Sequence, residues 1–327
     1  MRRPVFLAAA VFLAIIVMTW TVSIGEGIDA YYRSRLPDMV HGTAWRPYVT
    51  RALVPMVARA GGSVLPAGFT TPLGDADHTL VILIMGVSLV GYAFALRDLS
   101  GALFPARPLA ASLTALGALA FVPLFLYPFS RQIYDFTTLW LFTLVLACMA
   151  RARWAAFAVV FALASINKET AILLTIVFIA HYAVNRHGMT TAAFWRLLAF
   201  QLIVFAVIRA SIGYAFRNNE GGAVEMHLFD HNQHVLEHPM EMSKRLWLLI
   251  AAIAAGTWGW RQKPALLRHA LLVLAPILLV MGLTVGQLDE IRAYYEVYPV
   301  VALLVADTVW RGLKPSPSNI SPSEQHV

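Results

Sequence analysis

The sequence has little charge and almost no cysteine. Only 13% of its 327 residues are charged, whereas about a quarter are charged in a typical soluble domain. Hydrophobic residues make up 59% and the mean hydropathy is +0.67, which excludes an ordinary soluble protein. The single cysteine, Cys148, excludes an intramolecular disulfide and lies in an apolar run, as a small core residue would. The longest polar stretches, 25–77 and 216–245, are too short for a separate soluble domain, so we expect one integral membrane domain over residues 1–313.

The basic residues are scattered between apolar runs. The formal net charge is +7, but no basic block suggests a nucleic-acid partner. The pattern favours short cytoplasmic loops that face anionic membrane lipids. Residues 1–18 resemble a signal sequence but lack a small-x-small cleavage site, so we expect an uncleaved first span. The Pro- and Ser-rich residues 314–327 predict a disordered cytoplasmic tail.

Apolar segments long enough for membrane helices recur along the whole chain. Because only helices satisfy their own backbone in lipid without closing into a barrel, we expect an all-α polytopic membrane helix bundle. About ten transmembrane helices are predicted, at 5–24, 79–96, 109–127, 136–150, 154–167, 170–184, 197–213, 246–260, 270–285 and 295–310.

The orientation depends on residues 154–184. About 31 residues are long for one span and short for two. Two short helices place more basic residues of the short loops on one side, so we predict a break at 167–170. Both termini are then cytoplasmic, and the polar motifs lie on the outer side of the inner (plasma) membrane.

Two acidic residues follow the first predicted span. In a continuing helix, Glu26 and Asp29 share a face. Such a pair can hold a divalent cation or act as a general base. Ordinary acids at the start of a solvated loop are the structural alternative. The sequence therefore identifies no particular metal or cofactor, and a divalent cation is the candidate.

Residues 45–60 predict an interfacial helix in the first outer loop. Pro47 suits its first turn, and Tyr48 begins an apolar side that continues with Leu53, Met56 and Val57. Its arginines, Arg46, Arg51 and Arg59, suit a phosphate because a guanidinium binds it in a bidentate way. Anchoring to lipid headgroups explains the same arginines equally well.

The segment 131–135 joins two predicted spans on the outer side. A snorkelling Arg131 and a helix-capping Asp135 are the structural interpretation. A carboxylate directly before an apolar run favours a functional role for Asp135.

The strongest local signal is Asn167, Lys168 and Glu169, which interrupt the long apolar stretch. A structural Lys168–Glu169 pair needs an irregular turn, because adjacent helical residues do not face each other. In the functional interpretation, Lys168 contacts an anionic ligand and Glu169 orients Lys168 or a nearby arginine.

The last span is preceded by Glu290, Arg292 and Glu296, which could complete a charged cluster with Lys168 and Arg46. The neighbouring tyrosines suit an aromatic belt at the membrane interface.

Four histidines lie in the loop 216–245, spaced four, three and four residues apart. On one helix they share a face and could chelate a metal, although a solvated loop is the commoner explanation. They are His227, His231, His234 and His238.

The arrangement resembles the GT-C class of membrane glycosyltransferases. Glu26 and Asp29 match the acidic position of its first outer loop, and 46–60 matches its interfacial helix. The spacing of the acidic pair and the lack of a soluble C-terminal domain depart from the usual pattern. The resemblance implies transfer of a sugar from a polyprenyl-phosphate donor to an acceptor at the outer face. Its partners would be a lipid-linked sugar donor and membrane lipids.

The resemblance also implies roles for individual residues. Glu26 or Asp29 would be the base, and Arg46, Lys168 or Arg292 would hold the phosphate. A secondary transporter of a small anionic or polar solute is the alternative, since broken helices and buried charge suit it. A non-catalytic scaffold would not need several polar motifs on one side.

Overall fold

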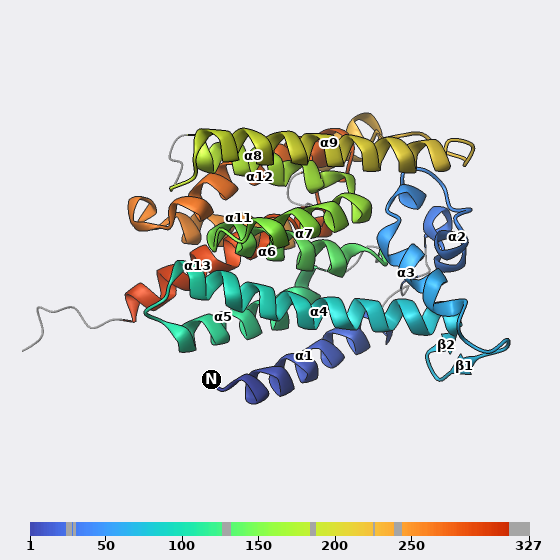
Figure 1. Ribbon diagram of the computed structural model, residues 1–327, viewed down its shortest axis with the longest axis horizontal. Helices are drawn as coiled ribbons and strands as arrows, with labels where there is room; N and C mark the ends of the chain where they lie inside the picture. The colour runs from blue at the N-terminus through green and yellow to red at the C-terminus, as the bar shows by residue number, and fades with distance from the viewer. Residues whose placement is uncertain are drawn as a thin grey trace, which may run out of the picture.

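The computed structural model describes residues 1–23, 28, 31–125, 132–183, 188–224, 226–238 and 244–313. These residues are almost entirely helical, with one two-stranded antiparallel ribbon that pairs Thr70 with Asp75 and Thr71 with Gly74. Most of the long helices run roughly along one axis of the molecule (Figure 1).

The bounds of the elements follow chain order. They are α1 (Arg3–Ser23), α2 (Leu36–His41), α3 (Leu53–Gly62), β1 (Thr70–Thr71), β2 (Gly74–Asp75), α4 (Ala76–Leu103), α5 (Pro108–Phe121), α6 (Asp135–Ala150), α7 (Trp154–Asn167), α8 (Ile172–Tyr182), α9 (Thr191–Ala215), α10 (Gln233–Glu237), α11 (Lys244–Thr257), α12 (Ala265–Thr284) and α13 (Tyr298–Gly312). Short 3₁₀ turns lie at Tyr48–Thr50, Glu169–Ala171 and Ile291–Tyr294.

A helix lies at each of the ten predicted segments. Among the described residues, four helices are long and apolar enough to cross a membrane by themselves, namely α1, α4, α9 and α12. Helices α5, α6, α7, α8 and α11 are apolar but shorter. Helix α13 has 15 residues, of which seven are buried inside the protein, and it carries the buried Asp307.

The chain reverses direction between α7 and α8. The ring of Trp154, the first residue of α7, lies 5.4 Å from that of Tyr182, the last residue of α8, and 6.2 Å from that of Phe178. The two helices are therefore antiparallel, and residues 154–182 form a helical hairpin rather than one long helix. Its turn is at Lys168, whose backbone is extended (φ −156°, ψ 144°).

Basic side chains gather at one end of the bundle. Arg97 donates to the Met1 carbonyl, and Arg151 pairs with Asp98 at 2.7 Å. Arg107, Lys263 and Arg311 surround Asp307 on α13. The start of α1 and the end of α13 thus lie at the same end of the bundle (Figure 1).

The segment 31–75 covers the opposite end (Figure 1). It contains the predicted interfacial helix, but α3 begins at Leu53 rather than near Pro47. The prediction was wrong because residues 48–50 form a separate 3₁₀ turn and Arg51 departs from helical geometry (ψ 70°). Val54, Pro55 and Ala58 of α3 are buried in the protein, whereas Met56 and Val57 of the predicted apolar side are exposed.

One contact with α7 and another within the segment itself hold this covering segment in place. The Ala52 amide donates to the Ile166 carbonyl near the end of α7 (3.2 Å). The Arg59 guanidinium donates to the Val40 carbonyl and so joins α3 to α2. Arg51 is thereby placed directly over the turn between α7 and α8.

Candidate functional site

A cavity of about 370 Å³ lies beneath this covering segment. Its walls come from residues 31–51, the start of α6, the turn between α7 and α8, the end of α12 and the turn 290–293. The charged side chains that line it are Arg51, Asp135, Lys168, Glu169, Glu290 and Arg292. The structure thus brings together six of the predicted site residues, from separate regions of the sequence.

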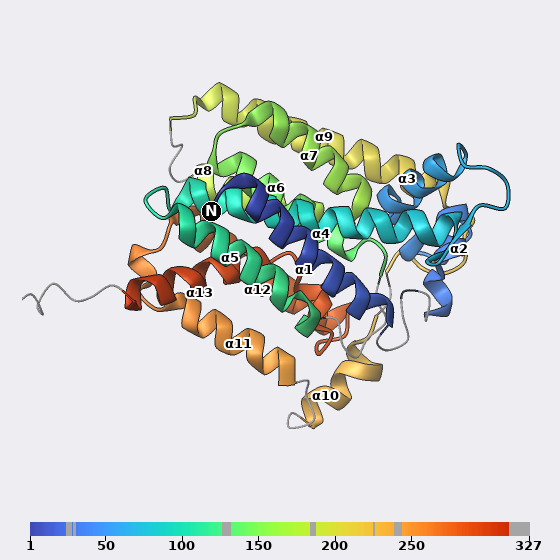
Figure 2. The same cartoon turned by 90° about the horizontal axis from the view of Figure 1, so that it is seen from below.

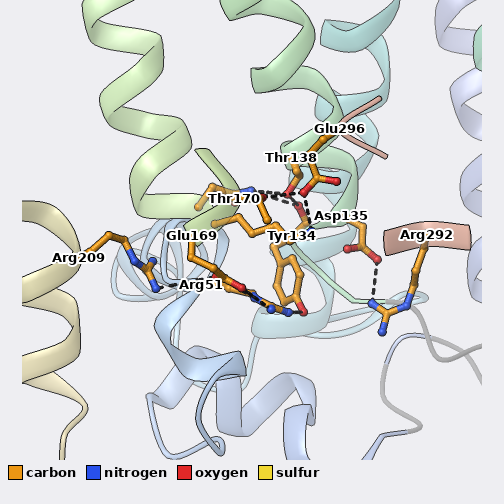
Figure 3. A network of polar contacts seen from close by, with 11 residues as sticks. Arg51, Tyr134, Asp135, Thr138, Glu169, Thr170, Arg209, Arg292 and Glu296 are labelled. Carbon is orange, nitrogen blue, oxygen red and sulfur yellow. Dashed lines mark hydrogen bonds and ion pairs between the residues drawn. The ribbon is translucent and has the colours of Figure 1, made fainter. Parts of the chain in front are cut away.

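One group of contacts centres on Glu169. Its carboxylate accepts from Arg51, with Nη2–Oε1 at 2.6 Å and with Nε at 3.2 Å from Oε1 and 3.3 Å from Oε2. Arg51 also donates to the Tyr134 hydroxyl, and Arg209 on α9 approaches Glu169 at 3.9 Å. Figure 3 shows Arg51 lying between Glu169 and Tyr134.

These contacts shift the pKa values of the pair. Burial opposes ionisation of Glu169, but the charge and hydrogen bonds of Arg51 outweigh it and lower the pKa of Glu169 to about 2. Burial alone would lower the pKa of Arg51, whereas Glu169 and Tyr134 raise it well above its usual value. Glu169 is therefore a fixed anion that orients Arg51. The functional interpretation of the sequence expected Glu169 to orient either Lys168 or a nearby arginine.

A second group lies deeper. Lys168 Nζ donates to Glu296 Oε1 at 2.8 Å, and the Thr170 hydroxyl donates to the same oxygen at 2.6 Å. Glu296 is fully buried, and its Oε2 has no hydrogen-bond partner among the described residues. The anionic partner of Lys168 is therefore Glu296 of the protein itself, while Glu169 pairs with Arg51.

The third group joins α6 to the turn before α13. The Arg292 guanidinium contacts Glu290 at 2.5 Å and Asp135 Oδ2 at 3.4 Å. Asp135 Oδ2 also accepts from the Gln132 amide at 3.2 Å. Asp135 is the first residue of α6, and among the described residues no side chain caps the start of this helix, so the predicted capping role was wrong. The Arg292–Asp135 contact, which Figure 3 marks, is longer than the direct pairs of Arg51 and Lys168 described above.

Asn167 supports the turn without lining the cavity. Its amide nitrogen donates to the Thr138 hydroxyl at 2.8 Å and to the Tyr134 carbonyl at 3.3 Å, and the side chain is fully buried. Asn167 therefore fixes the end of α7 against α6 and holds Lys168 and Glu169 in position.

The charges of these three groups balance. Arg51, Lys168, Arg209 and Arg292 are matched by four carboxylates within the described part of the chain. The carboxylates are Asp135, Glu169, Glu290 and Glu296. An anionic ligand must therefore compete with a carboxylate for a guanidinium or ammonium group. Among the cations that line the cavity, Arg292 has the longest such contact, to Asp135 at 3.4 Å, and this is the contact that the ligand would displace at least cost.

The structure does not place Arg46 in the cavity. Its guanidinium donates to the Asn219 and Gly221 carbonyls, at 3.0 and 2.7 Å, and ties the segment 31–75 to the loop after α9. Glu26, Asp29 and Arg131 lie outside the described residues. Tyr31, two positions after Asp29 in the sequence, lines the cavity.

The four histidines do not lie on one regular helix, because a π-helical turn at Leu228–Asn232 precedes α10. His231 Nε2 lies 2.8 Å from Asp289 Oδ1, and the rings of His234 and His238 are 4.5 Å apart. In the described part of the chain, no three histidine, cysteine or acidic side chains are close enough to hold a metal ion.

Sequence reasoning missed Arg209 and did not single out Tyr134. Arg209 lies inside the apolar run 197–213, and an arginine there is itself a signal for a partner at membrane depth. Tyr134 adjoins the predicted Asp135, but nothing in the sequence connects its hydroxyl with Arg51.

Comparisons with protein-family models, with curated proteins and with solved structures find no match to this chain.

Proposed function

We propose that this protein is a membrane-embedded glycosyltransferase of the inner membrane. It moves a sugar from a polyprenyl-phosphate donor to an acceptor at the outer face. In this proposal the bundle crosses the membrane about ten times, and both termini are cytoplasmic. The covered end with the charged cavity then faces outward, and the basic end faces the cytoplasm.

One observation carries the proposal. Charged residues from separate parts of the sequence line a single cavity at the end opposite the basic loops. Helices α7 and α8 have 14 and 11 residues, so they extend only about 21 and 17 Å. A hydrocarbon core is about 30 Å thick, and the turn at Lys168 is therefore recessed below the outer membrane surface. A lipid-borne phosphate and a water-borne acceptor can meet at that depth.

The cavity supports this chemistry in a defined way. Arg51, Lys168 and Arg292 provide positively charged groups that bind the phosphate of the sugar donor. Arg292 gives up its contact with Asp135 and binds a phosphate oxygen instead. The acceptor oxygen attacks the anomeric carbon, its proton passes to a carboxylate, and the carbon–oxygen bond to phosphate breaks with its electron pair on the phosphate. The freed Asp135 and the sequence candidates Glu26 and Asp29 are the carboxylates for that proton.

A secondary transporter remains the second candidate. The helical hairpin with an extended turn and the network of paired charges favour it. Such transporters are commonly built from structural repeats, and the sequence has no visible internal repeat. The lack of a repeat and the segment 31–75 that covers the cavity favour the enzyme.

Reconstituted protein distinguishes the two candidates. A polyprenyl-phosphate donor whose sugar is labelled is added to proteoliposomes. Transfer of the label to an acceptor, or hydrolysis of the donor, is then measured. Arg292→Lys should abolish either reaction, while Arg217→Lys should not, because within the described part of the chain Arg217 donates only to the Tyr214 carbonyl of its own turn. Flux of a small anion with no change in the donor would instead establish a transporter.

A further inference from the structure

A second, larger cavity lies outside the charged site. It is a groove of about 1550 Å³ between α1 and α4, and residues of α5 and α6 also line it. Figure 2 shows α1 lying across α4 and α5 on the outside of the bundle. This volume exceeds the range of about 300–1,000 Å³ that is usual for small-molecule pockets, so the groove has room for a long-chain molecule.

The wall of the groove is apolar along most of its length. It follows α1 from Arg3 to Ser23, a distance of about 30 Å. Val87 on α4 is 61% exposed, and Phe94 is also exposed to it. Gly86 opens into the groove, since a Cβ there would meet only Met18 Cγ, at 3.9 Å.

The charged side chains of the groove all lie at its basic end. They are Arg3, Arg97, Arg151 and Asp98. Asp98 is already bound by Arg151 at 2.7 Å, and Arg153 approaches it at 3.5 Å. Arg97 stacks over the Phe6 ring at 4.5 Å and donates to the Met1 carbonyl, so an excess of positive charge remains at the groove mouth.

We propose that this groove is a binding site for an anionic phospholipid of the leaflet at the basic end of the bundle. The phosphate lies against Arg97 and Arg3, and the acyl chains lie along α1 and α4 past Gly86 and Val87. An apolar channel with cations at one mouth matches the polarity of such a lipid. A donor lipid used at the outer face would carry its phosphate at the opposite end of α1.

Lipid binding to the purified full-length protein tests the site. Phosphatidylglycerol and phosphatidylcholine are titrated in detergent, and bound lipid is counted by native mass spectrometry. We expect phosphatidylglycerol to bind more tightly. Arg97→Gln should weaken its binding about fivefold, the effect of one basic residue at a charged lipid surface. Arg3 is exposed, so Arg3→Gln removes a charge from the same mouth without disturbing the contact between Arg97 and Phe6. Arg196→Gln on α9, away from the groove, is the matched control.

A groove-filling variant locates the chains. Gly86→Leu should reduce binding of both lipids, because its side chain occupies the channel, while the helix keeps a residue of good helical propensity. Equal binding of the two lipids by wild type and by both arginine variants would overturn the charge assignment. Unchanged binding by Gly86→Leu would overturn the groove as the site. Displacement of phosphatidylglycerol by a polyprenyl phosphate would identify a donor lipid as the occupant and overturn the proposal, whatever the outcome for glycosyl transfer.

Discussion

Lys168 and Glu296, 128 positions apart in the sequence, form an ion pair with Nζ–Oε1 at 2.8 Å. Glu296 is fully buried, and Lys168 is nearly so. The pair joins the turn between α7 and α8 to the turn before α13, and both segments contribute walls of the charged cavity. A change at Lys168 should therefore act on stability as well as on ligand binding.

The first prediction concerns this pair. Lys168→Met should lower the free energy of unfolding by about 3–5 kcal/mol, because it leaves a buried carboxylate without its cation. Lys168→Met/Glu296→Gln should recover most of that loss, since an amide can still accept from Thr170. Unfolding of both variants in mixed micelles measures the difference. If Lys168→Met/Glu169→Gln recovered stability instead, Glu169 would be the true partner.

The second prediction concerns Arg51. Lysine cannot reproduce the forked contact with Glu169 and Tyr134. Arg51→Lys should therefore reduce glycosyl transfer about a hundredfold, the usual effect of losing one donor at a developing negative charge. Arg217→Lys serves as the control in the same assay. Full activity in Arg51→Lys would remove Arg51 from the phosphate site.

The third prediction concerns Asp135. Asp135→Asn should slow transfer strongly while the donor still binds, because the amide cannot take up a proton. Asp75→Asn is the matched control, since Asp75 caps the exposed start of α4 and asparagine caps equally well. Donor affinity and turnover are measured on both variants. Equal turnover in Asp135→Asn and Asp75→Asn would show that Asp135 does not accept the proton, and Glu26 or Asp29 would then be the base.

The fourth prediction follows from the low pKa of Glu169. In the folded protein this pKa is about 2, below the ordinary glutamate value of 4.5 that applies to the unfolded chain. Glu169 therefore contributes stability above pH 4.5 that is lost as the pH falls toward 2. The stability advantage of wild type over Glu169→Gln should shrink across that range, and unfolding measured at about pH 7, 4 and 3 tests this. An advantage that is constant with pH would show that Arg51 does not stabilise the anion.

The fifth prediction concerns orientation. Because Cys148 is the single cysteine, Cys148→Ala gives a background for single-cysteine labelling. A cysteine at Leu73, which is exposed on the loop of the β ribbon, should react with an impermeant maleimide in spheroplasts. A cysteine at Arg153 should react only after permeabilisation. The reverse pattern would place the charged cavity in the cytoplasm.

The sequence by itself determined the helical class and the approximate positions of the ten apolar helices. Long apolar runs leave the backbone no alternative to helix in lipid, and each of the ten runs contains a helix. It also determined the break after Asn167, because two adjacent charges inside an apolar run cannot remain in a lipid-facing helix.

The tertiary structure alone decided which charges pair. Lys168 lies beside Glu169 in sequence, yet it pairs with Glu296, and Glu169 pairs with Arg51. The physical reason is that an extended backbone directs successive side chains to opposite sides, so the neighbours at the turn face different elements. The tertiary structure also decided the position of Arg46. Its hydrogen bonds to the loop after α9 hold its side chain away from the cavity.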